Sequence, residues 1–387
     1  MSKKMYALVG KWNFSPGSKG LSVYSYDPET VAMELIDTLF DDVNVGQQCI
    51  DTERNIVYIV NECSSRRGQT GGGGYVMAIK IDPETGRLAL INEKESLAPE
   101  PSYICLDKTK RYALVAHHVD HGHVTKIVKN KDGSYSSETQ FDDCALVLLR
   151  INEDGSLGDV CDVSVTQGEG VSGPHMIPHQ HSVISDPTGE LFVVCDKGMD
   201  KIYTYRLDRE KGKLVLLHEN VVETGMAPRY GVFHPTLPVF FENNERKTVG
   251  LAYRYDVTSG KLDQISSASL LLNEKAAEGI KKVEPSDILI HPNGKHLYIS
   301  VRGVNCIAVL DVNDTGSITL RQNISCGGEN PRGLCISPDA RCLFATNTES
   351  GNITAFSIGN DGFLSAIGTV TKTSCPGNMI IFAVKNF

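Results

Sequence analysis

The densest group of side chains that could bind a metal or move a proton lies between His117 and His123. The run His-His-Val-Asp-His-Gly-His places five potential ligands within seven residues. Transition metals bind imidazole and carboxylate groups, so this composition would suit a metal site. However, the run directly follows an apolar stretch at 112–116 and precedes a polar insertion, which is typical of a loop. We interpret it as a pocket wall or a surface turn rather than a metal site.

A second pair of histidines alternates along an expected strand. His179 and His181 are two residues apart, and alternate residues of a strand face the same side. A metal site built on this pair would need a third ligand, which the sequence does not place. We therefore expect acid–base or binding roles for these histidines, with no metal and no other cofactor.

One β-rich pattern recurs along the chain and predicts the elements that must position these side chains. Each copy has a strand led by proline, a turn, an apolar strand, a third strand, and a fourth strand after a glycine turn. In the clearest copy the strands begin near His181, Leu191, Lys201 and Gly212. Five further copies begin near Gln47, Pro101, Pro228, Pro285 and Pro331. Each copy predicts one four-stranded antiparallel blade.

The two ends of the chain supply a seventh copy in pieces. Residues 5–9, 20–27 and 33–40 read as strands two to four, and residues 376–382 read as strand one. Pairing the last strand with the first three closes the ring and removes an exposed sheet edge. We predict an all-β, seven-bladed β-propeller that forms a single domain over residues 1–387.

One interval between copies is longer than the others and indicates an insertion. The step from Pro101 to the copy that starts at Pro178 contains the turn Asn130-Lys-Asp-Gly133 within a polar stretch. This composition predicts an inserted hairpin at about residues 117–143. Only residues 270–282 offer helical periodicity, so a helical fold is excluded.

Composition and charge limit the class of partner. The formal net charge is −9, which argues against nucleic acid as the main ligand. No apolar run approaches the roughly 20 residues that a membrane helix needs. The eleven cysteines are odd in number and mostly lie in β-like runs, as expected for reduced, buried thiols. We therefore expect a cytoplasmic protein; nothing in the sequence indicates its oligomeric state.

Four segments resemble the lactonase family of seven-bladed β-propellers, and the resemblance spans the whole chain. They are residues 178–187, residues 225–235, Asn244-Glu245 and Arg302-Gly303. The family includes propeller-type 6-phosphogluconolactonases and, more distantly, the fungal carboxymuconate cyclase. Its active site lies in loops round the central channel, and its members are thought to need no metal.

The resemblance implies a catalytic group of one histidine, one glutamate and two arginines. The group proposed for the cyclase falls here on His181, Arg229, Glu245 and Arg302. Lactone hydrolysis needs a base to activate water, a donor for the developing oxyanion and a group that holds an anionic sugar acid. Glu245 or His181 could be the base, and the arginines could bind carboxylate or phosphate. The substrate-binding residues expected beside them are His179, Arg332, Asn347, His117 and Trp12, with His117 the nearest of its cluster to the axis.

The sequence also departs from the family pattern. Tyr230 stands where the family often has histidine, Val301 where it has asparagine, and Gly333 where a histidine often follows the arginine. The resemblance implies hydrolysis of a sugar-acid lactone, with 6-phosphogluconolactone as the first substrate to test, and the departures bear on which lactone is used. The alternatives are a lactone-forming cycloisomerase and a non-catalytic binding scaffold.

Overall fold

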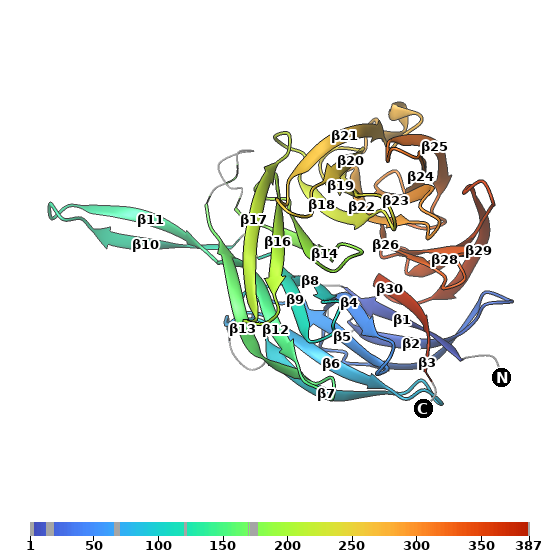
Figure 1. Ribbon diagram of the computed structural model, residues 1–387, viewed down its shortest axis with the longest axis horizontal. Coiled ribbons are helices and arrows are strands. Elements are labelled where there is room, and N and C mark those ends of the chain that lie inside the picture. The colour runs from blue at the N-terminus through green and yellow to red at the C-terminus, as the bar shows by residue number, and fades with distance from the viewer. Residues whose placement is uncertain are drawn as a thin grey trace.

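The computed structural model describes residues 4–12, 19–65, 70–119, 122–168, 170 and 177–385. Figure 1 shows seven blades arranged in a ring, with the first strand of each blade, the inner strand, nearest the axis. Each blade is a four-stranded antiparallel sheet. The predicted seven-bladed propeller is therefore confirmed, and the two ends of the chain lie close together in one blade.

The blades follow one another along the chain. Blade 1 consists of β4 (Val45–Asp51), β5 (Ile56–Asn61), β6 (Tyr75–Ile81) and β7 (Leu88–Glu95). Blade 2 consists of β8 (Pro101–Leu106), β9 (Tyr112–His117), β12 (Cys144–Ile151) and β13 (Leu157–Thr166). Blade 3 consists of β14 (Gln180–Ser185), β15 (Leu191–Asp196), β16 (Lys201–Asp208) and β17 (Lys213–Val221). Blade 4 consists of β18 (Pro228–Phe233), β19 (Val239–Asn244), β20 (Val249–Tyr255) and β21 (Leu262–Ser269).

The remaining blades complete the ring. Blade 5 consists of β22 (Glu284–Ile290), β23 (His296–Arg302), β24 (Cys306–Val312) and β25 (Ile318–Ser325). Blade 6 consists of β26 (Pro331–Ile336), β27 (Cys342–Asn347), β28 (Asn352–Ile358) and β29 (Leu364–Lys372). Blade 7 consists of β30 (Pro376–Ala383), β1 (Met5–Lys11), β2 (Gly20–Asp27) and β3 (Ala32–Leu39). The antiparallel pairing of β30 with β1 closes the ring as predicted.

The hydrophobic core lies between adjacent blades rather than inside any one sheet. The second strand of each blade is an apolar run, such as Leu191-Phe-Val-Val-Cys195, because both of its faces pack against neighbouring blades. For example, Phe192 packs with Leu114 of blade 2, while Leu191 packs with Phe240 of blade 4. Most residues of the outer strands are exposed or half-buried, because these strands lie at the rim of the ring.

An inserted hairpin stands off the ring at blade 2. Strands β10 (His123–Lys129) and β11 (Tyr135–Phe141) pair only with each other and project sideways from the ring (Figure 1). They fall inside the predicted insertion. The region with helical periodicity forms only the short 3₁₀ helix η1 (Glu274–Ala277). Among the described residues, no helix is long and apolar enough to cross a lipid bilayer.

A register shift near the start of every inner strand leaves one residue out of the ladder, or two in blades 1 and 5. Gln180 and Ser182 pair with Asp196 and Cys195, so His181 between them has no partner. Such an extra residue is a β-bulge, which re-aims a side chain. We call the equivalent residues the bulge positions. From blade 1 to blade 7 they are Gly46, Ser102, His181, Arg229, Ser286, Arg332 and Gly377.

A second set of equivalent residues follows or ends each second strand. The backbone N–H of Glu245 donates to the Ala227 carbonyl at 2.8 Å, and the residue two places after Ala227 is the bulge residue Arg229. The same alignment holds in every blade, and we call these residues the return positions. From blade 1 to blade 7 they are Glu62, His118, Lys197, Glu245, Arg302, Thr348 and Trp12. Because inner strands begin where second strands end, both sets gather at one end of the axis.

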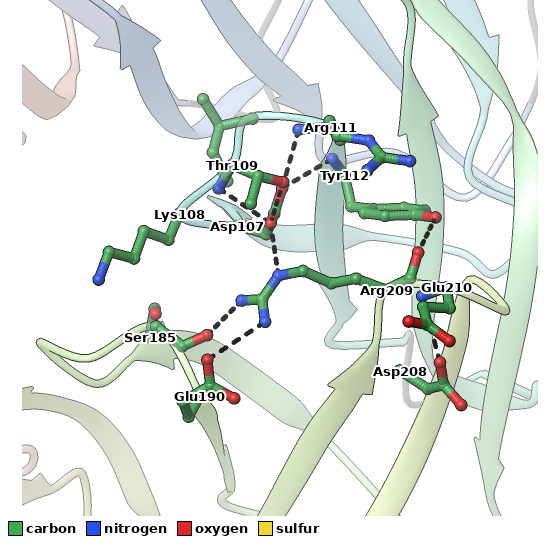
Figure 2. A network of polar contacts seen from close by, with 12 residues as sticks. Asp107, Lys108, Thr109, Arg111, Tyr112, Ser185, Glu190, Asp208, Arg209 and Glu210 are labelled. Atoms are coloured by element: carbon green, nitrogen blue, oxygen red, sulfur yellow. Dashed lines mark hydrogen bonds and ion pairs between the residues drawn. The ribbon is translucent and has the colours of Figure 1, made fainter.

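The opposite end of the ring is held together by charged links between blades. Figure 2 shows the Asp107 carboxylate in the turn after β8, where it accepts hydrogen bonds from the backbone N–H groups of Arg111 and Tyr112, both at 2.9 Å. Arg209 of blade 3 donates its Nε–H to the same carboxylate at 3.0 Å. Asp107 is buried, so this one side chain both closes its own turn and joins two blades.

Replacing Asp107 with alanine should therefore destabilise the fold. The change leaves buried N–H groups without an acceptor and Arg209 without its main partner, which should lower the free energy of unfolding by about 2–3 kcal/mol. Urea unfolding measures this loss. The matched control is Asp159→Ala, because the Asp159 side chain is 92% exposed and should contribute little. Equal stability of the two variants would contradict the role of Asp107.

Candidate active site

Three residues of the predicted catalytic group form one charged cluster at the axis. The Glu245 carboxylate accepts from Arg229 Nε at 2.9 Å and lies 3.6 Å from Arg302 Nη2. Lys197, at the return position of the preceding blade, donates to the other Glu245 oxygen at 2.8 Å. Arg302 also contacts Glu284 at 3.4 Å. Glu245 thus holds three cations from blades 3, 4 and 5.

This cluster keeps Glu245 ionised. Burial alone would raise the pKa of the Glu245 carboxyl, but Lys197, Arg229 and Arg302 together hold it well below its usual value. Burial lowers the pKa of Arg302 to about 10, with Arg229 adding to the effect. Arg229 is almost fully buried, and its Nη1 donates to the Ser286 carbonyl at 2.6 Å. The pairing therefore places fixed positive charge where a developing oxyanion could be stabilised.

His181 lies beside this cluster without sharing its ion pairs. Its ring meets the Tyr230 ring edge-to-face at 5.0 Å, and the Arg229 guanidinium lies 4.5 Å from the same Tyr230 ring. Burial holds the pKa of His181 well below 6.5, and the charges of Arg229 and Lys197 lower it further. His181 Nδ1 is buried with no hydrogen-bond partner among the described residues. A neutral imidazole in this state can accept a proton.

Aromatic rings fill the axis one step further along the inner strands. Tyr103 and Tyr230 each follow a bulge position, in blades 2 and 4, and their rings meet edge-to-face at 5.4 Å. Two side chains from blades that are not neighbours can meet only inside the ring. The two tyrosines therefore meet inside the ring, and Tyr230 also contacts His181 and Arg229.

The other side of the axis carries a second group from blades 1, 6 and 7. Trp12 donates its indole Nε1–H to Glu62 Oε2 at 2.5 Å, and the Arg332 guanidinium stacks on the Trp12 ring at 3.7 Å. Arg332 Nη2 lies 4.0 Å from the same Glu62 oxygen. Burial raises the pKa of Glu62 to about 7, against the opposing charge of Arg332. The two predicted residues Trp12 and Arg332 are thus brought together by a glutamate.

Three other predicted binding residues lie differently. His179 stacks on the His118 ring at 4.6 Å, beside the axial group. His117 faces into blade 2, where its Nδ1 is 2.8 Å from the Ala145 carbonyl, and burial lowers its pKa to about 4. Asn347 likewise faces into blade 6, donating to Thr354 Oγ1 at 3.2 Å. His117 and Asn347 both end a second strand, where alternation turns the side chain away from the axis.

The histidine-rich run does not act as one group. His118, rather than His117, contacts the His181 ring, at 5.5 Å, and its Nδ1 lies 3.6 Å from Glu100. His123 begins the exposed strand β10. Asp120 and His121 lie outside the described residues. The described histidines of the run therefore have three different surroundings.

Several axial residues were not predicted from the sequence. They are Glu62, Glu100, His118, Lys197 and Glu284. Three of these occupy return positions, as the predicted Glu245 and Arg302 do. The available signal was the residue that follows each apolar second strand, which is charged or polar in most blades. Grooves at the outer edge of the ring, such as one lined by Glu93, Lys94 and Asp159, contain none of these side chains.

Comparison with known proteins agrees with the fold. The family model for the lactonase seven-bladed β-propeller matches residues 7–381. The 6-phosphogluconolactonase of Bacillus subtilis (strain 168) is 25% identical over 341 residues, which cover 88% of this chain and 87% of that protein. The 6-phosphogluconolactonase of Formosa agariphila is 23% identical over 355 residues, which cover 90% of this chain and 91% of that protein.

A solved structure shows the same fold. The periplasmic gluconolactonase of Pseudomonas aeruginosa matches with a TM-score of 0.82 at 22% identity, covering 98% of this chain and all (100%) of that one. The match of the family model over nearly the whole chain, on a ring whose axial residues include the expected histidine, glutamate and arginines, identifies the family. This chain belongs to the lactonase family of seven-bladed β-propellers.

Proposed function

We propose that this chain hydrolyses the lactone of a sugar acid, with 6-phosphogluconolactone as its substrate. The observation that carries the proposal is the neutral, buried His181 beside cations that Glu245 holds in place. A lactone carbonyl near these groups would meet a base for water and positive charge for the oxyanion. The names of the relatives, 6-phosphogluconolactonases in two bacteria, support the same substrate.

His181 is the better candidate for the base. Glu245 is bound by Lys197, Arg229 and Arg302, which makes its carboxylate a poor proton acceptor. His181 is neutral, and its buried Nδ1 has no hydrogen-bond partner in the part of the chain that the structure describes. In the proposed reaction His181 takes a proton from water as the water oxygen attacks the carbonyl carbon. Glu245 acts through the cations that it positions, which stabilise the oxyanion.

Arg332 is the proposed ligand of the phosphate. Its guanidinium is partly exposed, stacks on Trp12 and lies on the opposite side of the axis from Lys197 and Glu245. In the δ-lactone of 6-phosphogluconate, the phosphate is on the carbon outside the ring, and the ring oxygen separates the carbon that bears this group from the carbonyl carbon. The two groups of charges therefore suit the two ends of one substrate.

The reaction as proposed needs no metal or organic cofactor, because side chains supply both the base and the positive charge that stabilises the oxyanion. The partner is a small anionic lactone, and the net charge of −9 does not favour nucleic acid. All eleven cysteines are free thiols, which suits the reducing environment of the cytoplasm. We place the enzyme there.

The test is hydrolysis of phosphorylated and unphosphorylated aldonolactones, followed by pH-stat titration with a chelator present. Turnover of 6-phosphogluconolactone above the spontaneous rate is expected, at least tenfold faster in kcat/KM than turnover of gluconolactone. Loss of activity on adding chelator would contradict the metal-free reaction. Absence of turnover with every lactone would overturn the proposed function.

Arg332→Met serves as the control for the substrate. The variant should lose the preference for the phosphorylated lactone, through a higher KM, while it retains turnover of gluconolactone. An unchanged preference would show that the phosphate binds elsewhere.

A further inference from the structure

We propose that Glu62 is the general acid of this site, which gives its proton to the ring oxygen that leaves when the lactone opens. This inference rests on the proposed lactone hydrolysis. Glu62 and Glu245 occupy the same return position in blades 1 and 4. Blade 4 is three steps from blade 1 in a ring of seven, which is about 150° around the axis. The two carboxyl groups therefore face each other across the substrate position.

The two glutamates differ because the bulge positions beside them differ. In blade 4 the bulge residue is Arg229, which pairs with Glu245 at 2.9 Å. In blade 1 it is Gly46, and a Cβ added there would lie 2.4 Å from Glu62 Oε2. Blade 1 thus lacks a side chain at this position, and the Glu62 carboxyl fills the space. Among the described residues, no cation of blade 1 pairs with it. The Glu245 carboxyl is therefore kept ionised, whereas the Glu62 carboxyl can keep a proton.

The charged groups that face Glu62 come from three other blades. Arg332 lies 4.0 Å away and lowers its pKa, and Arg229 lowers it from a greater distance. Glu100 of blade 2 raises it. Burial outweighs the two arginines, so the pKa of Glu62 rises to about 7. The surroundings of the two carboxyl groups move their pKa values apart, so Glu62 can donate a proton while Glu245 stays ionised and holds its cations.

The contacts of Glu62 also orient it. Trp12 and Arg332 both approach Oε2, so Oε1 is the oxygen that can face a substrate. Arg332 is the proposed phosphate ligand, and the phosphate-bearing carbon is bonded to the carbon that carries the ring oxygen. A substrate held by Arg332 therefore brings its leaving oxygen to Glu62 and its carbonyl carbon toward His181.

The proton transfers balance. Water adds to the carbonyl carbon and gives a proton to His181. When the bond between the carbonyl carbon and the ring oxygen breaks, the electron pair stays on that oxygen, which takes the Glu62 proton. The product is the open hydroxy acid; His181 releases its proton to solvent, and Glu62 takes one up.

The first test uses Trp12, the only tryptophan of the chain, as a reporter of Glu62. Fluorescence of the full-length protein without substrate should titrate with a midpoint near pH 7, and Glu62→Gln should abolish that step, because an amide keeps the indole hydrogen bond but does not ionise. A step that persists in the variant, or a wild-type step at pH 4 to 5, would overturn the assignment. This readout does not depend on lactonase activity.

The second test is the pH profile of kcat with 6-phosphogluconolactone. Wild-type kcat should fall about tenfold per pH unit well above pH 7, as Glu62 loses its proton. Glu62→Gln should lower kcat about 100-fold at pH 6.5, leave KM nearly unchanged and remove this alkaline limb, whereas Glu62→Asp should retain it. The matched control is Glu29→Gln, at a side chain that is 80% exposed.

The outcomes separate this inference from the proposed function. Wild-type turnover with an alkaline limb that Glu62→Gln leaves in place would refute the acid role alone. A merely structural role for Glu62 would lower kcat at all pH values without changing the profile. No wild-type turnover would refute the proposed function, whatever the fluorescence titration shows.

Discussion

His181→Ala should lower kcat for lactone hydrolysis by about 10³-fold, within the range that general-base catalysis contributes. The imidazole is neutral because burial and the charges of Arg229 and Lys197 hold its pKa well below 6.5. Wild-type activity should therefore persist below pH 6 and decline only as the pH falls through that lowered pKa. Initial rates between pH 5 and 9 measure both effects.

The matched control is His218→Ala, on the exposed outer strand of blade 3, which should keep wild-type rates. The His181→Ala protein should remain folded, with a thermal midpoint lowered only by the loss of the ring contacts to Tyr230 and His118, because no hydrogen bond of Nδ1 is lost. Full turnover by His181→Ala would remove the histidine from the reaction and leave Glu245 as the only proposed base.

Glu245→Gln should lower both turnover and stability. The carboxylate pairs with Lys197 at 2.8 Å and Arg229 at 2.9 Å, and the Arg229 side chain is only 1% exposed. Removing the shared anion leaves buried cations to repel one another, which should cost about 3 kcal/mol in the free energy of unfolding. The cations also lose their positions, so kcat should fall at least about 100-fold.

A double variant distinguishes the two losses. Lys197→Met combined with Glu245→Gln removes one of the repelling cations and should recover part of the stability without recovering turnover. Urea unfolding and initial rates measure the two quantities on the same proteins. A double variant as active as the wild type would show that Glu245 and Lys197 do not serve catalysis.

The ring itself could be predicted because each blade repeats a pattern that one sequence displays. The apolar second strand, as in Leu191–Asp196, recurs in every copy, and a proline leads the inner strand of every blade except blade 1. The split blade could also be predicted, since residues 376–382 supply the one strand that the N-terminal segments lack. Burial on both faces of each second strand is the physical reason for its apolar run.

The axial site was only partly predictable. Single bulges decide which residue turns to the axis, and a one-residue shift exchanges the two faces of a strand. The sequence pattern does not mark these shifts, so His117 was chosen where His118 contacts His181. Glu62 was missed for a related reason. The space that admits its carboxyl exists because Gly46 at the bulge position has no side chain, and in the sequence Gly46 looks like an ordinary turn glycine.

The central claim is that lactones are hydrolysed at the axis, between the groups of Glu62 and Glu245. A crystal structure with the product, 6-phosphogluconate, tests it most directly. The product should lie over Tyr230, with its phosphate on Arg332 and its carboxylate toward Arg229 and Arg302. Product bound in a groove between outer strands at saturating concentration, with the axis empty, would contradict the claim.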